Sequence, residues 1–150
     1  MQRLRALQEI AQCSFIDSTP KIANPIQKFL YKVGVKLKLY WTFNRINSKI
    51  IDEARSYSFD LVWIDKGLAV RASTIKKLKA LPTKPKLVFY SPDDMSNRAN
   101  QSVHYLRSIP LFDLHVTTKS YNVAELKKMA LRMPISLGTH LIRLCINRLS

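Results

Sequence analysis

Two short apolar runs separated by a basic helical pattern constrain the fold of this chain more than any other feature. The first run is Leu61–Ile64 and the second is Leu87–Tyr90, and charged residues follow both of them. Residues 72–81, which lie between the runs, have the apolar spacing of a helix. Because the connection is too long for a hairpin, we predict that the two strands lie parallel.

The polar residues that follow both strands are predicted to meet. Right-handed crossovers between parallel strands place the carboxyl ends of the strands at one edge of the sheet. Ligands of open α/β sheets bind at that edge. We therefore expect Asp65 and Lys66, after the first strand, to share a crevice with Asp93 and Asp94, after the second.

The rest of the chain predicts further alternation of helices and strands. Further strands are expected at 14–17 and 114–117, and loop or short helix at 95–108. Helices are expected at 2–12, at 26–57 with a break near Gly34, and at 121–129 with Ser120 as the cap. This order predicts an α/β fold, a Rossmann-like, doubly wound parallel sheet. Its usual opening strand is absent, because the first helix begins at residue 2.

Composition narrows the class of protein. The chain has 150 residues with 47% hydrophobic content, which favours one folded domain over disorder. No apolar run has the length of a membrane span, and Cys13 and Cys145 form neither a disulfide framework nor a metal-binding spacing. We therefore expect a cytoplasmic protein with reduced thiols. The net charge of +15 favours anionic partners, and its spread over several helices is not typical of a device that reads bases.

Aromatic residues and lysines alternate in residues 29–41. A basic amphipathic helix of this kind binds anionic membrane surfaces. The same pattern also suits a partly buried helix whose lysine stems extend over apolar surface. The sequence slightly favours the second interpretation, and the first would place the protein at the inner face of the membrane.

An ordered set of segments resembles a known family. The segments are Phe59–Gly67 with the lysine-rich helix after it, Lys86–Asp94, Phe112-Asp113, Thr117–Leu126 and the opening Arg3–Leu7. Together they resemble the N-terminal half of glycosyltransferases with two Rossmann-like domains, the GT-B class. The CgeB-like branch, the spore maturation protein type, is the most similar. The resemblance covers about residues 2–129.

The resemblance implies a role for the strand ends. In that class the N-terminal domain chiefly holds the acceptor, the C-terminal domain chiefly holds the nucleotide sugar, and no cofactor is expected. Asp93 or Asp94 would be the catalytic base on an acceptor hydroxyl. The acceptor-binding residues would be Asp65, Lys66, Ser91, Thr118 and Lys119.

Structural explanations compete with these roles. Asp93 is also suited to cap the following turn, and Asp94 to pair with Arg98. Thr118 and Lys119 fit an ordinary helix cap as well as an anion-binding helix start. The three histidines show no ligand spacing, so no metal site is expected.

Two departures from the family pattern predict a truncated protein. The opening strand is missing, and residues 130–150 do not match the continuation that relatives have. One inserted base after the Met129 codon allows that tail to encode the family segments, so we expect 1–129 to be a partial domain and 130–150 an out-of-frame tail. We expect no sugar transfer by this chain alone. The alternative function is a stand-alone basic module for nucleic acid or anionic lipid, although no recognised nucleic-acid motif supports sequence-specific binding.

Overall fold

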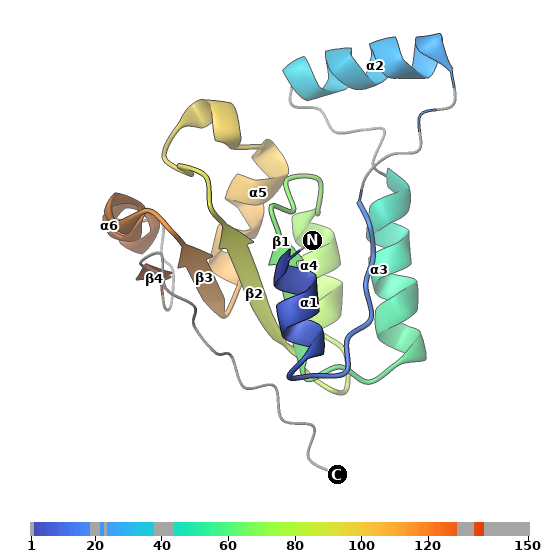
Figure 1. Ribbon diagram of the computed structural model, residues 1–150, viewed down its shortest axis with the longest axis vertical. Coiled ribbons are helices and arrows are strands. Elements are labelled where there is room, and N and C mark those ends of the chain that lie inside the picture. The colour runs from blue at the N-terminus through green and yellow to red at the C-terminus, as the bar shows by residue number, and fades with distance from the viewer. Residues whose placement is uncertain (1, 19–21, 23, 38–43, 129–133, 137–150) are drawn as a thin grey trace.

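A parallel sheet of four strands organises the fold, as the ribbon of the computed structural model shows (Figure 1). The structure describes residues 2–18, 22, 24–37, 44–128 and 134–136. The strands are β1 (Leu61–Asp65), β2 (Lys86–Ser91), β3 (Leu114–Thr117) and β4 (Pro134–Ser136), and they are adjacent in this order. In the register of the sheet Asp65 pairs with Tyr90, and Ser91 pairs with Thr117. The carboxyl ends of β1, β2 and β3 therefore lie together at one edge.

Helices alternate with the strands from β1 onwards. The helices are α1 (Gln2–Gln8), α2 (Pro25–Lys36), α3 (Asn44–Ser56), α4 (Ala72–Lys79), α5 (Val103–Ser108) and α6 (Ser120–Lys128), with short 3-10 helices η2 (Arg98–Asn100) and η3 (Ile109–Leu111). Helices α4, α5 and α6 are the crossovers between successive strands. This arrangement confirms an α/β fold with a parallel sheet and helices, compatible with a Rossmann-like domain.

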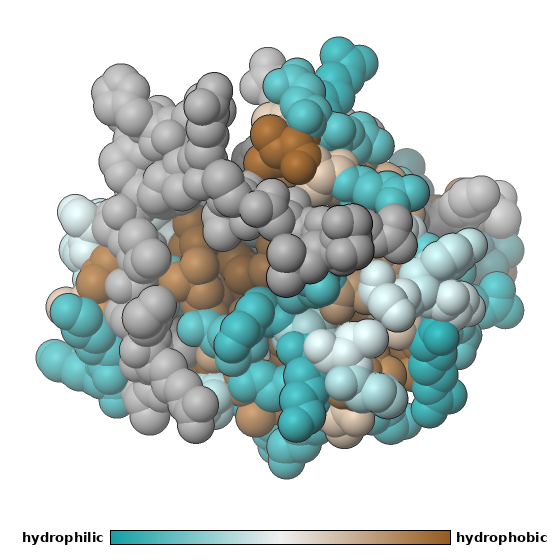
Figure 2. All heavy atoms as spheres, turned by 90° about the horizontal axis from the view of Figure 1, so that it is seen from below, coloured by the Kyte–Doolittle hydropathy of each residue, from teal (hydrophilic) through white to brown (hydrophobic). Residues whose placement is uncertain are grey.

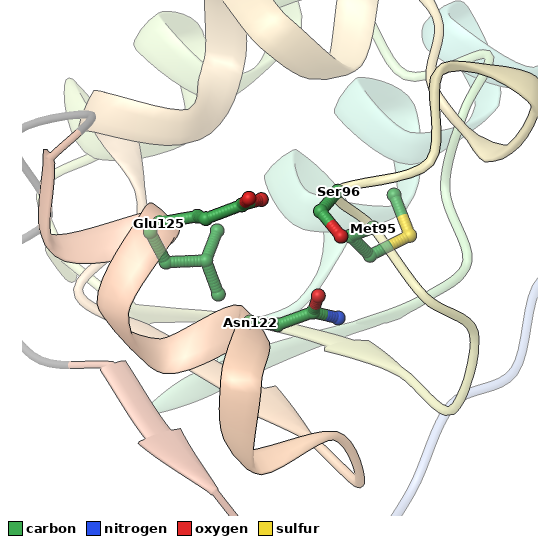
Figure 3. A pocket seen from close by; sticks show the side chains of 5 residues that line it. Met95, Ser96, Asn122 and Glu125 are labelled. Carbon is green, nitrogen blue, oxygen red and sulfur yellow. The ribbon is translucent and has the colours of Figure 1, made fainter.

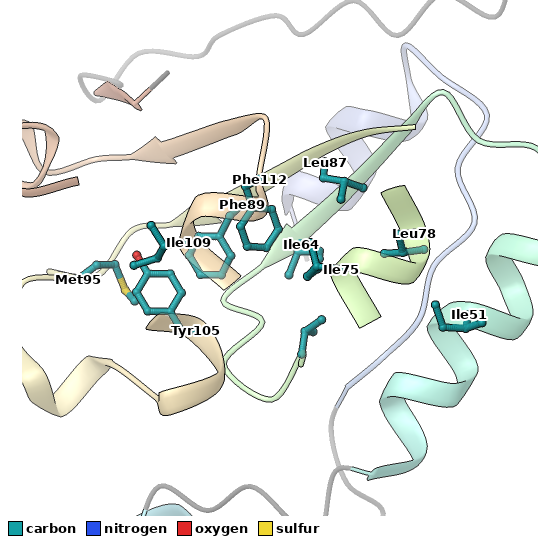
Figure 4. Packing of buried hydrophobic residues seen from close by; sticks show 11 residues of the cluster. Ile51, Ile64, Ile75, Leu78, Leu87, Phe89, Met95, Tyr105, Ile109 and Phe112 are labelled. Carbon is teal, nitrogen blue, oxygen red and sulfur yellow. The ribbon is translucent and has the colours of Figure 1, made fainter. Parts of the chain in front are cut away.

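Alternation along β2 gives the sheet two apolar faces. Leu87 and Phe89 belong to the larger core, together with Ile75 and Leu78 of α4 and with residues of α3 and α5 (Figure 4). Because successive side chains of a strand point to opposite faces, Val88 and Tyr90 belong to a second cluster. The rings of Trp63 and Tyr90 stack in that cluster, with centroids 5.5 Å apart.

A polar side chain of α3 attaches this helix to the segment that follows β1. Asn47 of α3 accepts hydrogen bonds from the Arg71 N–H at 2.9 Å and the Thr74 hydroxyl at 2.7 Å. Its amide also donates to the Ala69 carbonyl at 3.1 Å. These contacts fix α3 against the loop that connects β1 to α4.

The strand predicted at residues 14–17 does not form. Residues 12–18 have no regular secondary structure, and among the described residues no strand precedes β1. The Ser14 hydroxyl instead donates to the carboxylate of Glu53, and the segment runs beside α3 (Figure 1). A strand needs a hydrogen-bonded neighbour, and this segment lies against a helix rather than at the edge of β1.

Helix boundaries also differ from the predictions. α1 ends at Gln8 rather than at residue 12, and Gly34 lies inside α2, which ends at Lys36. Ser120 is the first residue of α6 instead of the cap before it. Patterns of apolar spacing locate helices well but define their ends poorly. The predicted strand at 114–117 and the short helix within 95–108 are confirmed.

The predicted out-of-frame tail falls mostly outside the described residues. Within it the structure describes only residues 134–136, which pair with β3 as the parallel strand β4.

Hydrophilic side chains cover much of the surface seen from below, with hydrophobic ones visible between them (Figure 2). In the part of the chain that is described, no helix has both the length and the apolarity needed to cross a bilayer.

Candidate functional site at the carboxyl edge of the sheet

Strand β1 delivers the first polar residues to the carboxyl edge. Asp65 is its last residue and is exposed, and Lys66 follows with a φ of 50°. The Lys66 N–H donates to the Tyr90 carbonyl at 2.9 Å, which continues the ladder to β2 for one more residue. A left-handed backbone is unusual for lysine, and it redirects the chain where the strand ends.

An ion pair links the ends of β1 and β2. The Lys66 Nζ lies 2.9 Å from Oδ2 of Asp93, and both side chains remain partly exposed, at 46% and 42%. Of the four residues that were expected to share a crevice, Lys66 and Asp93 are in contact at this edge. Lys66 is paired within the chain, so an incoming anion would meet a lysine that already has a carboxylate partner.

Asp94 is held by the loop that it begins. Its Oδ1 accepts hydrogen bonds from the N–H of Ser96 at 3.0 Å and from the Ser96 hydroxyl at 2.5 Å. The Ser96 hydroxyl is the main cause of a lowered pKa for the Asp94 carboxyl, and the charge of Lys119 lowers that pKa further. The turn bond predicted for Asp93 is thus made by Asp94, and the Asp93 N–H donates to the Ser91 hydroxyl at 3.2 Å.

Asn122 of α6 holds the same loop from the other side. Its side chain is 1% exposed and points toward Ser96 and Met95 (Figure 3). With the amide oriented to satisfy both of its ends, Nδ2 donates to the Asp94 carboxylate at 2.8 Å and the oxygen accepts from the Met95 N–H at 2.9 Å. No sequence pattern singled out Asn122, because its role depends on the packing of α6 against the loop after β2.

Strand β3 contributes hydroxyl groups to the edge. The Thr118 hydroxyl donates to the Pro92 carbonyl at 2.9 Å, and the Thr117 hydroxyl accepts from the Lys119 N–H at 3.1 Å. Ser91, a predicted acceptor-binding residue, is only 2% exposed. Its hydroxyl supports the Asp93 backbone, so the structure places Ser91 beneath the surface of the site.

The edge is open rather than enclosed. A cavity of about 10 Å³ lies beside it, lined by Met95, Ser96, Asn122, Glu125 and Leu126 (Figure 3). That volume has room for about one water molecule. A larger ligand would therefore have to lie across the exposed edge, above Lys66 and Asp93.

His115 lies in the core of the fold rather than at this edge. His115 is 1% exposed among the rings of Phe89, Phe112 and Tyr105. Burial lowers its pKa from 6.5 to about 4. His140 lies outside the described residues. Among the residues that the structure describes, no group of three histidine, cysteine or carboxylate side chains is arranged to hold a metal ion.

The edge combines the partly exposed Asp93 carboxylate and Lys66 ammonium group with the Thr118 hydroxyl, which is half-buried. Carboxylates accept hydrogen bonds from hydroxyl groups, and ammonium groups bind anions, so the edge suits a hydroxyl-rich or acidic ligand. No protein-family model, no curated protein and no solved structure matches this chain.

Proposed function

We propose that the carboxyl edge of this sheet binds the acceptor of a glycosyl transfer reaction. The domain would then correspond to the acceptor-side half of a GT-B glycosyltransferase of the CgeB-like type, as the resemblance of its segments suggests. The observation that carries the proposal is the contact between Lys66 and Asp93 at adjacent parallel strand ends. This is the edge at which open α/β sheets bind ligands.

Asp93 fits the part of general base better than Asp94. In the transfer reaction the acceptor hydroxyl loses its proton to a base while its oxygen attacks the anomeric carbon of the donor. The bond from that carbon to the phosphate oxygen breaks, and the nucleotide leaves with the electron pair. The Asp94 carboxylate is engaged by Ser96 and has a lowered pKa, which makes it a weaker base. Asp93 keeps an exposed carboxylate, and Lys66 beside it can bind an acidic group of the acceptor.

Asp94 then has a supporting role in the proposed site. Together with Asn122 it orders the loop that carries Asp93, while Thr118 fixes Pro92 at the start of that loop. Because the edge is open, the nucleotide sugar would reach it from a second domain that faces these residues, as in the GT-B class. The proposed partners are therefore a glycan acceptor and a nucleotide-sugar donor.

Saccharide binding by the purified protein tests the proposal. An array of neutral and acidic oligosaccharides would identify a ligand, and titration would give its Kd for the wild type and for Asp93→Asn. We expect Asp93→Asn to weaken binding roughly tenfold or more, because a hydrogen bond to a charged group contributes about 1.5–3 kcal/mol.

Asp60→Asn is the matched control. Asp60 is exposed and precedes β1, so it lies at the opposite end of the same strand. We expect its substitution to leave the Kd unchanged. Absence of saccharide binding by the wild type, or equal loss in both variants, would refute a saccharide site at this edge.

A further inference from the structure

Helix α2 presents an apolar stripe to solvent. Ile26, Phe29, Leu30, Val33 and Leu37 follow the spacing of one helical face. Ile26 is 72% exposed, Phe29 65% and Leu37 60%. Only Gly34 of this helix is buried. The apolar face therefore remains largely in contact with water.

Helix α2 does not pack against the other described elements of the fold. The helix lies beyond the sheet and the other helices in Figure 1, and no other described helix or strand packs against it. No described helix or strand supplies the apolar surface over which the lysine stems were expected to extend, and residues 38–41 of that segment lie outside the described residues. Hydrophobic side chains of this size are normally buried, so a face of this kind indicates a binding surface.

Charge beside the stripe indicates what it binds. Lys28, Lys32 and Lys36 recur every fourth residue, so they form a basic row along one side of the apolar face. No acidic residue occurs between Asp17 and Asp52. A second copy of the helix would bring equal charges together. Nucleic acid would leave Phe29 and Ile26 without apolar contacts. A surface that is both anionic and apolar fits best.

We propose that α2 is an interfacial helix that docks this protein on an anionic lipid bilayer. At 12 residues the helix is about 18 Å long, too short to cross a hydrocarbon core of about 30 Å. It lies in the plane of the interface, with Phe29 and Ile26 among the acyl chains and the lysines at the lipid phosphates. The inference is independent of the saccharide site, because no α2 residue belongs to that site.

Flotation with lipid vesicles tests the proposal. The wild-type protein should float with vesicles of phosphatidylcholine mixed with phosphatidylglycerol and remain unbound with phosphatidylcholine alone. Ile26→Ser/Phe29→Ser should lower the partition coefficient roughly tenfold or more, because apolar insertion supplies part of the affinity. The control Val103→Ser/Leu106→Ser changes two exposed residues of α5 and should bind as the wild type does.

A series of charge variants distinguishes binding through the lysine row of α2 from attraction by the net charge of the whole protein. Lys28→Glu/Lys32→Glu/Lys36→Glu should lower the partition coefficient roughly 100-fold, in line with the attraction of each lysine to anionic lipid. Lys76→Glu/Lys77→Glu/Lys127→Glu changes the net charge equally at exposed residues of α4 and α6. Circular dichroism of each variant should show that it is folded.

Three outcomes would overturn the proposal. The first is no flotation of the wild type with anionic vesicles at low salt. The second is equal loss of binding in both charge variants, which would show attraction by net charge alone. The third is unchanged binding in the Ile26→Ser/Phe29→Ser variant, which would show that the apolar stripe does not insert.

Discussion

The Nζ of Lys66 lies 2.9 Å from the carboxylate of Asp93 although the two residues are 27 positions apart in the sequence. The two residues follow adjacent parallel strands, so the contact depends on the register in which Asp65 pairs with Tyr90. Lys66 reaches this position from a left-handed backbone conformation, with a φ of 50°. The contact thus combines an exposed ion pair with local backbone strain.

Glycine at Lys66 should separate these two contributions to stability. Lys84 has the same left-handed backbone, with a φ of 45°, and lies in the turn before β2 without a role at the site. We expect Lys84→Gly to raise the free energy of unfolding by up to about 1 kcal/mol, because glycine relieves the strain. Lys66→Gly should change it by less, since an exposed ion pair worth about 0–1 kcal/mol is lost at the same time. Urea denaturation measures both, and a loss above about 2 kcal/mol for Lys66→Gly would contradict the estimate.

Stability should fall with acid because of His115. Its pKa is lowered from 6.5 to about 4 in the folded protein, mainly by burial, so below pH 6.5 the unfolded chain binds the proton more readily. The free energy of unfolding therefore falls as the pH drops from about 6.5 toward 4. At pH 5 the loss that His115 causes is about 2 kcal/mol. Urea denaturation at pH 7 and pH 5 measures the loss.

Two variants isolate this effect. His115→Phe keeps a ring among Phe89 and Phe112 but cannot be protonated, so its stability should change less between pH 7 and pH 5. His104→Gln removes the other described histidine with a lowered pKa, which burial and Arg71 cause. An equal acid loss in wild type and His115→Phe would show that other groups are responsible.

Alanine at Gly67 should destabilise the fold through crowding. A Cβ at this position would lie 2.2 Å from Cγ2 of Ile64 and 3.0 Å from Cγ2 of Val70. Ile64 is buried, so the cost should be about 1–3 kcal/mol, as for other overpacked cores. Thermal or urea denaturation measures it. In an Ile64→Ala background the same substitution should cost clearly less, and strict additivity would exclude this contact as the cause.

The Asn47 side chain should contribute more to the free energy of unfolding than its position on a helix surface suggests. Asn47→Ala removes hydrogen bonds to Arg71, Thr74 and Ala69, so we expect a loss of about 1–3 kcal/mol. Ser48→Ala is the matched control, because the Ser48 hydroxyl bonds only within its own helix, to the Arg45 carbonyl. Similar losses in both variants would show that α3 is not fixed through Asn47.

Removal of the buried Tyr105 hydroxyl should have the opposite effect and should not lower the stability of the fold. Tyr105 is 1% exposed, and its hydroxyl has no hydrogen-bond partner among the described residues. Burial also raises its pKa well above 10. We expect Tyr105→Phe to keep or raise the free energy of unfolding, by about 1 kcal/mol at most, since an unsatisfied buried polar group is removed. A loss of more than about 1 kcal/mol in urea denaturation would show that the hydroxyl has a partner.

Local patterns were enough to determine the central α/β unit. The apolar runs at Leu61–Ile64 and Leu87–Tyr90 and the spacing between them predicted parallel strands, and the parallel register placed Lys66 and Asp93 at one edge. This worked because strand alternation and crossover handedness are local rules. The strand predicted at residues 14–17 failed, because pairing requires a neighbour that local sequence cannot guarantee.

The sequence by itself determined which residues follow the strands, the fold class and the basic character of the chain. Only the tertiary structure decided how those residues are used. Asp94 is committed to Ser96 and Asn122, whereas Asp93 is exposed beside Lys66. The tertiary structure also decided that the apolar face of α2 is exposed to solvent. The physical reason is that hydrogen bonding and burial depend on segments distant in sequence, and those meet only when the chain folds.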